Sequence, residues 1–232
     1  MYIFTGNPMK KLLLIVVASC LLFTDCASSV KIMSGYEHVD VSKSNVGIIL
    51  PFKTIYIENT SDVLQYLGGF NASDAYRQFF AHEFTKVLKK RSKFKNVTFV
   101  NDDENYHLRD TLIRQKYPRI YPTAFRGTTD SLQYLLIFSG LVVGREKAKK
   151  FKIGFEARSA FCGMGSNEIN DAFDKLYHSG AFLLWDNVQG RIVSYGRFKT
   201  DQPIIFKMTK NNWNDIMYDV AYAIMSGTPY GK

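Results

Sequence analysis

The sequence predicts an α+β or α/β domain in which about two to three helices cover a single mixed sheet of about five to six strands. Three observations lead to this fold class. Two segments, 74–91 and 213–225, carry apolar side chains at helical spacing. Residues 132–143 form an almost unbroken apolar run, which is typical of a strand buried on both faces. Short apolar or alternating segments elsewhere in the chain supply the remaining strands.

The first strand is expected at residues 46–52, an apolar Val-Gly-Ile-Ile-Leu-Pro-Phe segment. The first helix is expected at residues 74–91. Within it, Tyr76, Phe80 and Phe84 recur every four residues and place an aromatic stripe against a core. Three cations close this helix, where positive charge suits the negative end of the helix dipole.

The middle of the chain is expected to add strands and a further helix. Residues 97–100 predict a short strand, and residues 106–116 predict a helix that ends before Pro118. Residues 151–161 alternate loosely between apolar and polar side chains. We therefore expect them to pair, through a basic turn, with the strand at 132–143.

The C-terminal part of the chain predicts a hairpin and a last helix. Residues 181–185 and 191–195 flank the segment Asp-Asn-Val-Gln-Gly, which indicates a hairpin turn. Five apolar residues define the buried face of the helix at 213–225, namely Trp213, Ile216, Met217, Val220 and Ile224. The expected order of elements is therefore β-α-β-(α)-β-β-β-β-α.

Residues 1–28 have the plan of a bacterial secretory signal. Lys10 and Lys11 form a short basic segment, residues 12–23 are almost wholly apolar, and small and polar residues follow. The apolar run has about twelve residues, whereas a helix that spans a bilayer needs about 20. We therefore expect an exported protein in the periplasm or at the outer membrane, with a membrane-spanning signal anchor as the less favoured alternative.

Two cysteines in or just after the apolar run are candidates for lipidation. The residues that end at Cys20 match the bacterial lipoprotein box in type, but only a short apolar stretch precedes them. Cys26 follows the whole apolar run, although Asp25 stands where such boxes have a small residue. Cleavage near Ser28 without lipidation is a third alternative. We favour lipidation, at Cys26 before Cys20, and interpret Cys162 as a small core residue unless an anchor at Cys20 leaves Cys26 to pair with it.

The rest of the chain predicts a short tether and one globular domain. Residues 29–45 are polar and lack a periodic apolar pattern, so we interpret them as a tether between membrane and domain. Residues 46–232 contain no linker rich in proline, glycine or serine. The aromatic content of the chain, 15%, argues against disorder. This length is enough for one sizeable hydrophobic core.

The positive charge of the chain, formally +9, is concentrated in two short segments. The candidate contacts for an anionic partner are Lys86, Lys89, Lys90, Arg91, Lys93, Lys147, Lys149 and Lys150. Because the chain carries an export signal, the expected anion is a lipid headgroup or a wall polymer, and nucleic acid is not an expected partner. A solvated helix end and a solvated turn are the simpler interpretation, which we prefer, since charge runs mostly keep a surface wet.

The sequence lacks the motifs of common catalytic and cofactor sites. His82 and Glu83 begin like a helical zinc-protease motif, but Lys86 stands where the second histidine is needed. The Gly-Met-Gly segment at 163–165 lacks the third glycine of a dinucleotide site. The acidic residues 102–104 lack the spacing of a calcium loop, and no Gly-x-Ser-x-Gly segment is present. We therefore expect no cofactor, no metal and no enzymatic activity.

Three segments carry a likeness to known envelope proteins: the 46–52 strand followed by a helix, Tyr-Leu-Leu-Ile-Phe-Ser-Gly at 134–140, and Leu-Leu-Trp-Asp-Asn-Val-Gln-Gly-Arg-Ile-Val at 183–193. In these segments the chain resembles bacterial envelope lipoproteins and periplasmic domains akin to the amino-terminal domain of TolB, the curli secretion lipoprotein and the penicillin-binding-protein activator lipoproteins. The long segment 101–130 and the irregular segment 163–180 depart from that pattern. The resemblance implies a docking or assembly module without a shared catalytic site.

Together these features predict a non-enzymatic envelope lipoprotein that docks a partner protein near a membrane. The alternative is a binder of anionic lipid or wall polymer that acts through the basic segments. A hydrolase whose residues are distant in sequence is the less favoured third hypothesis. A deep pocket that gathers His178, Asp186 or Cys162 would favour it, and a featureless surface there would count against it.

Overall fold

The computed structural model of the chain describes residues 29–50, 55–58, 72–100, 107–113, 117–124, 131–147, 173–204 and 208–232. Contacts divide the chain into two units. One unit comprises Cys26–Lys147 and Asp174–Lys232 and contains every helix and strand discussed below. The other comprises Met1–Asp25 and Ala148–Phe173, of which only Phe173 belongs to the described residues.

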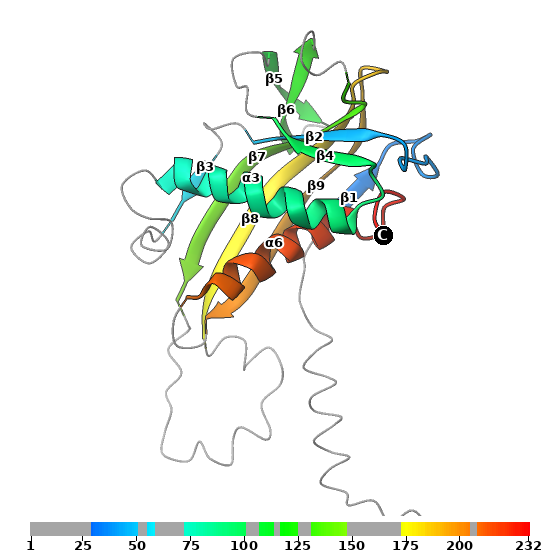
Figure 1. Ribbon diagram of the computed structural model, residues 1–232. Helices are drawn as coiled ribbons and strands as arrows, with labels where there is room; N and C mark the ends of the chain where they lie inside the picture. Colours follow the sequence, from blue (N-terminus) through cyan, green and yellow to red (C-terminus); the bar gives the residue numbers. More distant parts are fainter. Residues whose placement is uncertain are drawn as a thin grey trace, which may run out of the picture. The chain divides into compact units, whose positions relative to one another are not determined.

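Seven strands form one mixed sheet with the order β1-β9-β8-β7-β2-β4, and β3 pairs with β7 beside this path (Figure 1). The strands are β1 (Ser29–Ile32), β2 (Asn45–Ile49), β3 (Ile55–Ile57), β4 (Asn96–Phe99), β7 (Tyr134–Glu146), β8 (Asp174–Asp186) and β9 (Arg191–Ile204). Strand β2 runs parallel to β4 and β7, β3 also runs parallel to β7, and β7, β8, β9 and β1 pair antiparallel. Two further strands, β5 (His107–Ile113) and β6 (Tyr117–Ala124), form a separate antiparallel hairpin.

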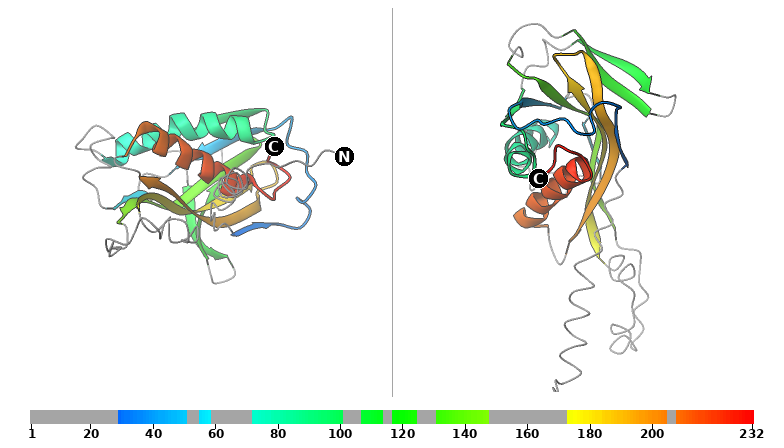
Figure 2. Two further views of the ribbon diagram at one scale, coloured as in Figure 1. Left: turned by 90° about the horizontal axis from the view of Figure 1, so that it is seen from below. Right: turned by 90° about the vertical axis from the view of Figure 1, so that its right-hand side faces the viewer.

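Helices α3 (Ala72–Arg91) and α6 (Lys210–Met225) lie side by side on one face of the seven-stranded sheet (Figure 2). The predicted α+β class, with a mixed sheet covered by helices, is confirmed. Within the described ranges, neither helix combines the length and the apolar character that crossing a bilayer requires.

The main core lies between the helices and the sheet and is rich in aromatic rings. Phe80 and Phe84 of α3 stack with their centroids 4.6 Å apart, and both meet the edge of Phe138 on β7, at 5.1 and 5.3 Å. Phe138 in turn meets Phe198 of β9 at 6.2 Å. The four-residue spacing on α3 thus places these rings against the sheet, as the sequence predicts.

A second, smaller apolar cluster lies on the other face of the sheet. Its buried members are Ile49, Leu135, Ile137 and Leu183. Side chains alternate between faces along a strand, so Leu136 and Phe138 join the main core while Leu135 and Ile137 join this cluster. Burial on both faces is the reason that β7 reads as an unbroken apolar run.

The segment expected to be a tether, 29–45, is instead packed into the domain. Its first four residues form β1, which pairs with β9 from Ser29 opposite Arg197 to Ile32 opposite Ser194. Tyr36 is buried, and its hydroxyl donates a hydrogen bond of 2.8 Å to Asp186 Oδ2. Burial, with help from that carboxylate, raises the pKa of the Tyr36 hydroxyl. The polar composition of residues 29–45 gives no local signal of this strand, because the strand depends on pairing with the distant β9.

One expectation for the middle of the chain differs from the structure, and another concerns residues that the structure does not describe. The described part of the helix expected at 106–116, His107–Ile113, is instead strand β5 and pairs with β6. The aromatic and β-branched residues of Tyr117–Ala124 favour a strand, and cross-strand pairing then outweighs a weak helical pattern. The expected strand at 151–161 lies outside the described residues. The neighbours of β7 are β8 on one side and β2 and β3 on the other.

Gly47 on β2 lies where the second face of the sheet is closely covered. A Cβ atom at this position would lie 2.7 Å from Leu132 Cδ1 and 2.9 Å from Val100 Cγ2. We expect Gly47→Ala to lower the free energy of unfolding by about 1–3 kcal/mol, because the core has no room for the methyl group. Urea denaturation measures this loss. Thr98→Ala is the matched control, because Thr98 is the exposed register partner of Gly47 on β4, and equal stability of both variants contradicts the prediction.

Candidate functional site

Five predicted cations gather where α3 ends and turns toward β4: Lys86, Lys89, Lys90, Arg91 and Lys93. We call them the basic end of α3. The last turn of the helix holds three of them, where its unpaired carbonyl groups favour positive charge. The interaction with the end of the helix therefore explains why these cations occur here, whether or not they also bind a partner.

Several of these cations contact other parts of the chain. The Arg91 guanidinium lies 3.8 Å from the centroid of the Tyr218 ring on α6. Lys93 Nζ donates a hydrogen bond of 2.9 Å to the carbonyl oxygen of Pro229. Lys89 and Lys90 are exposed at the surface. The basic end of α3 is thus partly fixed by contacts with the C-terminal segment.

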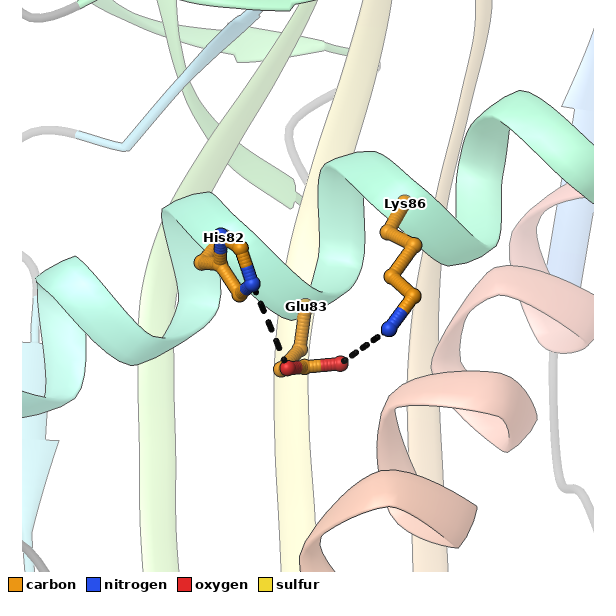
Figure 3. Close-up of polar contacts among 3 residues, drawn as sticks. All are labelled: His82, Glu83 and Lys86. Atoms are coloured by element: carbon orange, nitrogen blue, oxygen red, sulfur yellow. Dashed lines mark ion pairs between the residues drawn. The ribbon is translucent and has the colours of Figure 1, made fainter.

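The histidine of the zinc-like motif, His82, contacts an acidic residue of its own helix. Glu83 lies between His82 and Lys86, with its Oε1 3.6 Å from His82 Nε2 and its Oε2 3.9 Å from Lys86 Nζ (Figure 3). Lys86 occupies the place of a second ligand and brings a positive charge that repels a metal ion. Among the described residues, no group of three or more histidine, cysteine or acidic side chains is placed to hold a metal ion.

An open groove of about 350 Å³ runs between the two helices beside these residues. Its polar lining consists of Glu83, Lys86 and Lys90 from α3 and Asn214, Asp215 and Tyr218 from α6. Two carboxylates and two ammonium groups face this groove, so its floor is of mixed charge. The net positive charge lies beside the groove at the C-terminal end of α3, where the last turn carries Lys89, Lys90 and Arg91.

Two tyrosines extend this surface along α6. Tyr218 is 41% exposed and Tyr222 is 49% exposed, although most large apolar side chains of the helix are buried. They stand four residues apart, and residues at this spacing lie on the same face of a helix. Because Arg91 stacks on Tyr218, the basic end of α3 and the two tyrosines form one continuous surface, which we call the docking surface.

Lys147, the described residue of the second predicted basic segment, does not join the docking surface. Lys147 follows the last residue of β7, whereas Lys93 and Lys95 lie beside the first residues of β2 and β4. Strand β7 starts at Tyr134, which pairs with Val46 near the start of β2. Its 13 residues span about 40 Å, so Lys147 lies at the opposite end of β7 from Lys93 and Lys95. Lys149 and Lys150 lie outside the described residues, as do the candidate lipidation sites Cys20 and Cys26.

A second open groove, of about 650 Å³, lies at the start of α3 and beside β4. Arg77 lines it, with its Nε donating a hydrogen bond of 3.2 Å to the Leu50 carbonyl and its guanidinium 5.6 Å from the Phe99 ring centroid. Asp74 and His82 also face this groove. Sequence reasoning missed it, since Arg77 and Phe99 come from different elements.

The residues of the hydrolase hypothesis are not gathered in one site. His178 is fully buried in the middle of β8 and Asp186 ends the same strand, about 26 Å away along the backbone. The Asp186 carboxylate organises the β8–β9 turn, where its Oδ1 accepts hydrogen bonds from the amides of Val188 and Gln189 at 3.0 and 2.8 Å. Cys162 lies outside the described residues.

Comparison with known proteins gives no family. No family model matches the chain, and no curated protein matches it. Among solved structures, the chain is similar to a PelC dodecamer from Paraburkholderia phytofirmans, with 11% identity, a TM-score of 0.35 and coverage of 84% of this chain and 98% of that one. A single-substitution variant of that dodecamer gives 10% identity, a TM-score of 0.34 and coverage of 84% and 96%. At these TM-scores the likeness carries no conclusion about this chain.

Sequence reasoning named the cations of the docking surface but not its two tyrosines. Tyr218 and Tyr222 interrupt the apolar periodicity of α6 and fall outside the buried face set by Trp213 and Val220. Two large aromatic side chains four residues apart on the polar side of an amphipathic helix are the signal that could have identified them.

Proposed function

We propose that this chain is a non-enzymatic docking module of the bacterial envelope, exported and held at a membrane by a lipid on its N-terminal cysteine. Its partner is a protein that presents acidic groups to the docking surface. The leader sequence, with Cys26 or Cys20 near its end, supports the lipid anchor.

The single observation that carries the docking role is the stacked pair of Arg91 and Tyr218 at the surface. Exposed tyrosine and arginine are the residue types enriched at the centres of protein interfaces. Tyr222 extends this aromatic surface, and Lys89 and Lys90 supply positive charge beside it. A partner with carboxylates opposite these cations gains both attraction and orientation.

The test of this proposal is the retention of detergent-solubilised envelope proteins on the immobilised full chain. We expect the double variant Tyr218→Ala/Tyr222→Ala to retain its partner at least about tenfold less well, since anchor aromatics contribute about 2 kcal/mol or more at interfaces. Retention should also weaken with salt, because the cations contribute to it.

Tyr56→Ala is the matched control for this experiment. Tyr56 is 57% exposed but lies on β3, away from α6. A protein that is retained by the wild type and by this control, and lost with the double tyrosine variant, supports the proposal. Retention that survives the loss of both tyrosines contradicts it.

The alternative function, binding of an anionic lipid or wall polymer, is favoured by the exposed ammonium groups of Lys89 and Lys90. Such binding depends on these charges and not on the tyrosines. Retention of a purified wall polymer that is lost with Lys89→Gln/Lys90→Gln but kept with the double tyrosine variant would favour this alternative.

A further inference from the structure

A group of buried polar atoms interrupts the apolar core between the helices and the sheet. The atoms are Nδ1 and Nε2 of His178, the hydroxyl oxygen of Thr200 and the hydroxyl oxygen of Tyr76. All four are buried, and none has a hydrogen-bond partner among the described residues. Most buried polar atoms in native proteins are hydrogen-bonded, either to the chain or to ordered water. Such a group therefore indicates a ligand that completes its hydrogen bonds.

The register of the sheet brings His178 and Thr200 face to face. His178 of β8 is the antiparallel partner of Thr200 on β9, so the two side chains project to the same side of the sheet. The Cβ atoms of directly opposite residues lie about 5 Å apart. Leu176 and Phe198, each two positions away on the same two strands, belong to the main core. Because side chains alternate along a strand, His178 and Thr200 also point toward the helices.

The helices close the group from the other side. The centroid of the Tyr76 ring on α3 lies 5.6 Å from that of the imidazole, edge to face. The Trp213 ring on α6 lies 6.1 Å from the imidazole and 6.3 Å from the Tyr76 ring. Val143, the partner of His178 on β7, adds an apolar wall. We call the space that His178, Thr200 and Tyr76 share the His178 site.

The chemistry of the His178 site favours a small neutral ligand. Burial keeps the imidazole and the phenol uncharged at neutral pH, because it lowers the pKa of His178 to about 3 and raises the pKa of Tyr76 well above its ordinary value. A neutral imidazole has one donor and one acceptor nitrogen, and each hydroxyl group can donate and accept. These three side chains would give an ion no counter-charge, whereas water donates and accepts at once.

We propose that the His178 site binds buried water, which bridges the imidazole to the hydroxyl groups of Thr200 and Tyr76. A buried water molecule typically makes about three hydrogen bonds to polar atoms that would otherwise be unsatisfied, and the site has room in its chemistry for about one or two. The water brings no counter-charge, so the imidazole stays neutral. It links α3 to the sheet through hydrogen bonds, whereas Phe80 and Phe84 link the same helix through direct ring contacts with the sheet.

Water in this site exchanges slowly with solvent. His178 and Tyr76 have no exposed surface, Thr200 is 1% exposed, and α3 and α6 cover this face of the sheet (Figure 2). The water leaves only when a helix moves away from the sheet for a moment, and such local opening is far slower than the exchange of surface water. A long residence time therefore distinguishes it from surface hydration.

Nuclear magnetic relaxation dispersion of the water signal counts long-lived water molecules in the purified full chain. The variant Tyr76→Phe/His178→Leu/Thr200→Val removes the four polar atoms and keeps side chains of similar size. We expect it to lose about one or two long-lived water molecules relative to the wild type. The matched control is Leu176→Met, a change of similar volume in the same core that removes no polar atom and should keep the wild-type count.

A crystal structure of the wild-type chain tests the site without any variant, should the triple variant fail to fold. We expect an ordered water molecule within about 3.2 Å of an imidazole nitrogen of His178 and of the hydroxyl oxygen of Thr200 or Tyr76. An unchanged count of long-lived water in the folded triple variant overturns the His178 site. Direct hydrogen bonds from His178 to both hydroxyl groups, with no water between them, overturn it as well.

Discussion

Acidification should destabilise this protein, with the free energy of unfolding falling as the pH decreases from about 6.5 to about 3. Burial lowers the pKa of the His178 imidazole from 6.5 to about 3 in the folded chain. Between these two values the unfolded chain binds a proton that the folded chain does not. Lower pH therefore favours unfolding across this window, and below about 3 both states are protonated and the loss stops growing.

The environment of His178 explains both the direction and the size of this effect. The imidazole lies in a ring of side chains from four elements: Tyr76 of α3, Trp213 of α6, Thr200 of β9 and Val143 of β7. Among these, Tyr76 titrates, and burial raises its pKa well above the ordinary value, so it stays neutral. Neither imidazole nitrogen has a hydrogen-bond partner among the described residues, so nothing offsets a buried positive charge.

The expected loss is about 1.4 kcal/mol for each pH unit below the ordinary pKa of histidine, or about 2–3 kcal/mol at pH 4.5. Urea denaturation at a series of pH values measures it. His178→Leu should remove most of the slope, because it fills the site with an apolar side chain of similar size. His82→Gln is the control, since His82 is exposed on α3 and its loss should leave the slope in place. A slope that persists in His178→Leu would show that other groups cause the acid sensitivity.

The elements that the sequence predicts well are those whose signal is local. Helix α3 is marked by aromatic residues every four positions, and β7 by an apolar run that burial on both faces requires. The β8–β9 turn is marked by Asp186 and Gly190, whose φ of 64° suits glycine. Each of these features is contained in fewer than about twenty residues, and propensity and periodicity are sufficient to find it.

The features that the sequence does not reveal depend on distant pairings. Strand β1 has four residues and is recognisable only through β9, which lies more than a hundred positions later. The stacking of Arg91 on Tyr218 joins two helices that are more than a hundred residues apart in the sequence. His178 looks like any polar residue in a strand, and its complete burial follows from α3 and α6 packing over β8. Such contacts are set by tertiary packing, which overrides local pattern.

Replacement of Trp213 by alanine should produce the largest loss of stability among single changes in this domain. Trp213 is fully buried and meets the ring of Phe79 at 5.5 Å, Tyr76 at 6.3 Å and His178 at 6.1 Å. It thus connects α6 both to α3 and to the sheet. Removing a large buried aromatic side chain costs about 3–5 kcal/mol, because the lost burial is accompanied by a cavity that the neighbours fill only partly.

Thermal and urea denaturation measure this effect, and Tyr222→Ala is the matched control on the same helix. Tyr222 is about half exposed, so its replacement should change the free energy of unfolding by about 0.5 kcal/mol or less. If Trp213→Ala loses no more stability than this control, α6 does not fold together with the sheet. If Trp213→Ala instead unfolds in one transition with a much lower midpoint, α3, α6 and the sheet form one cooperative unit. The docking surface then requires the intact core, because Arg91 and Tyr218 meet only while both helices are packed on the sheet.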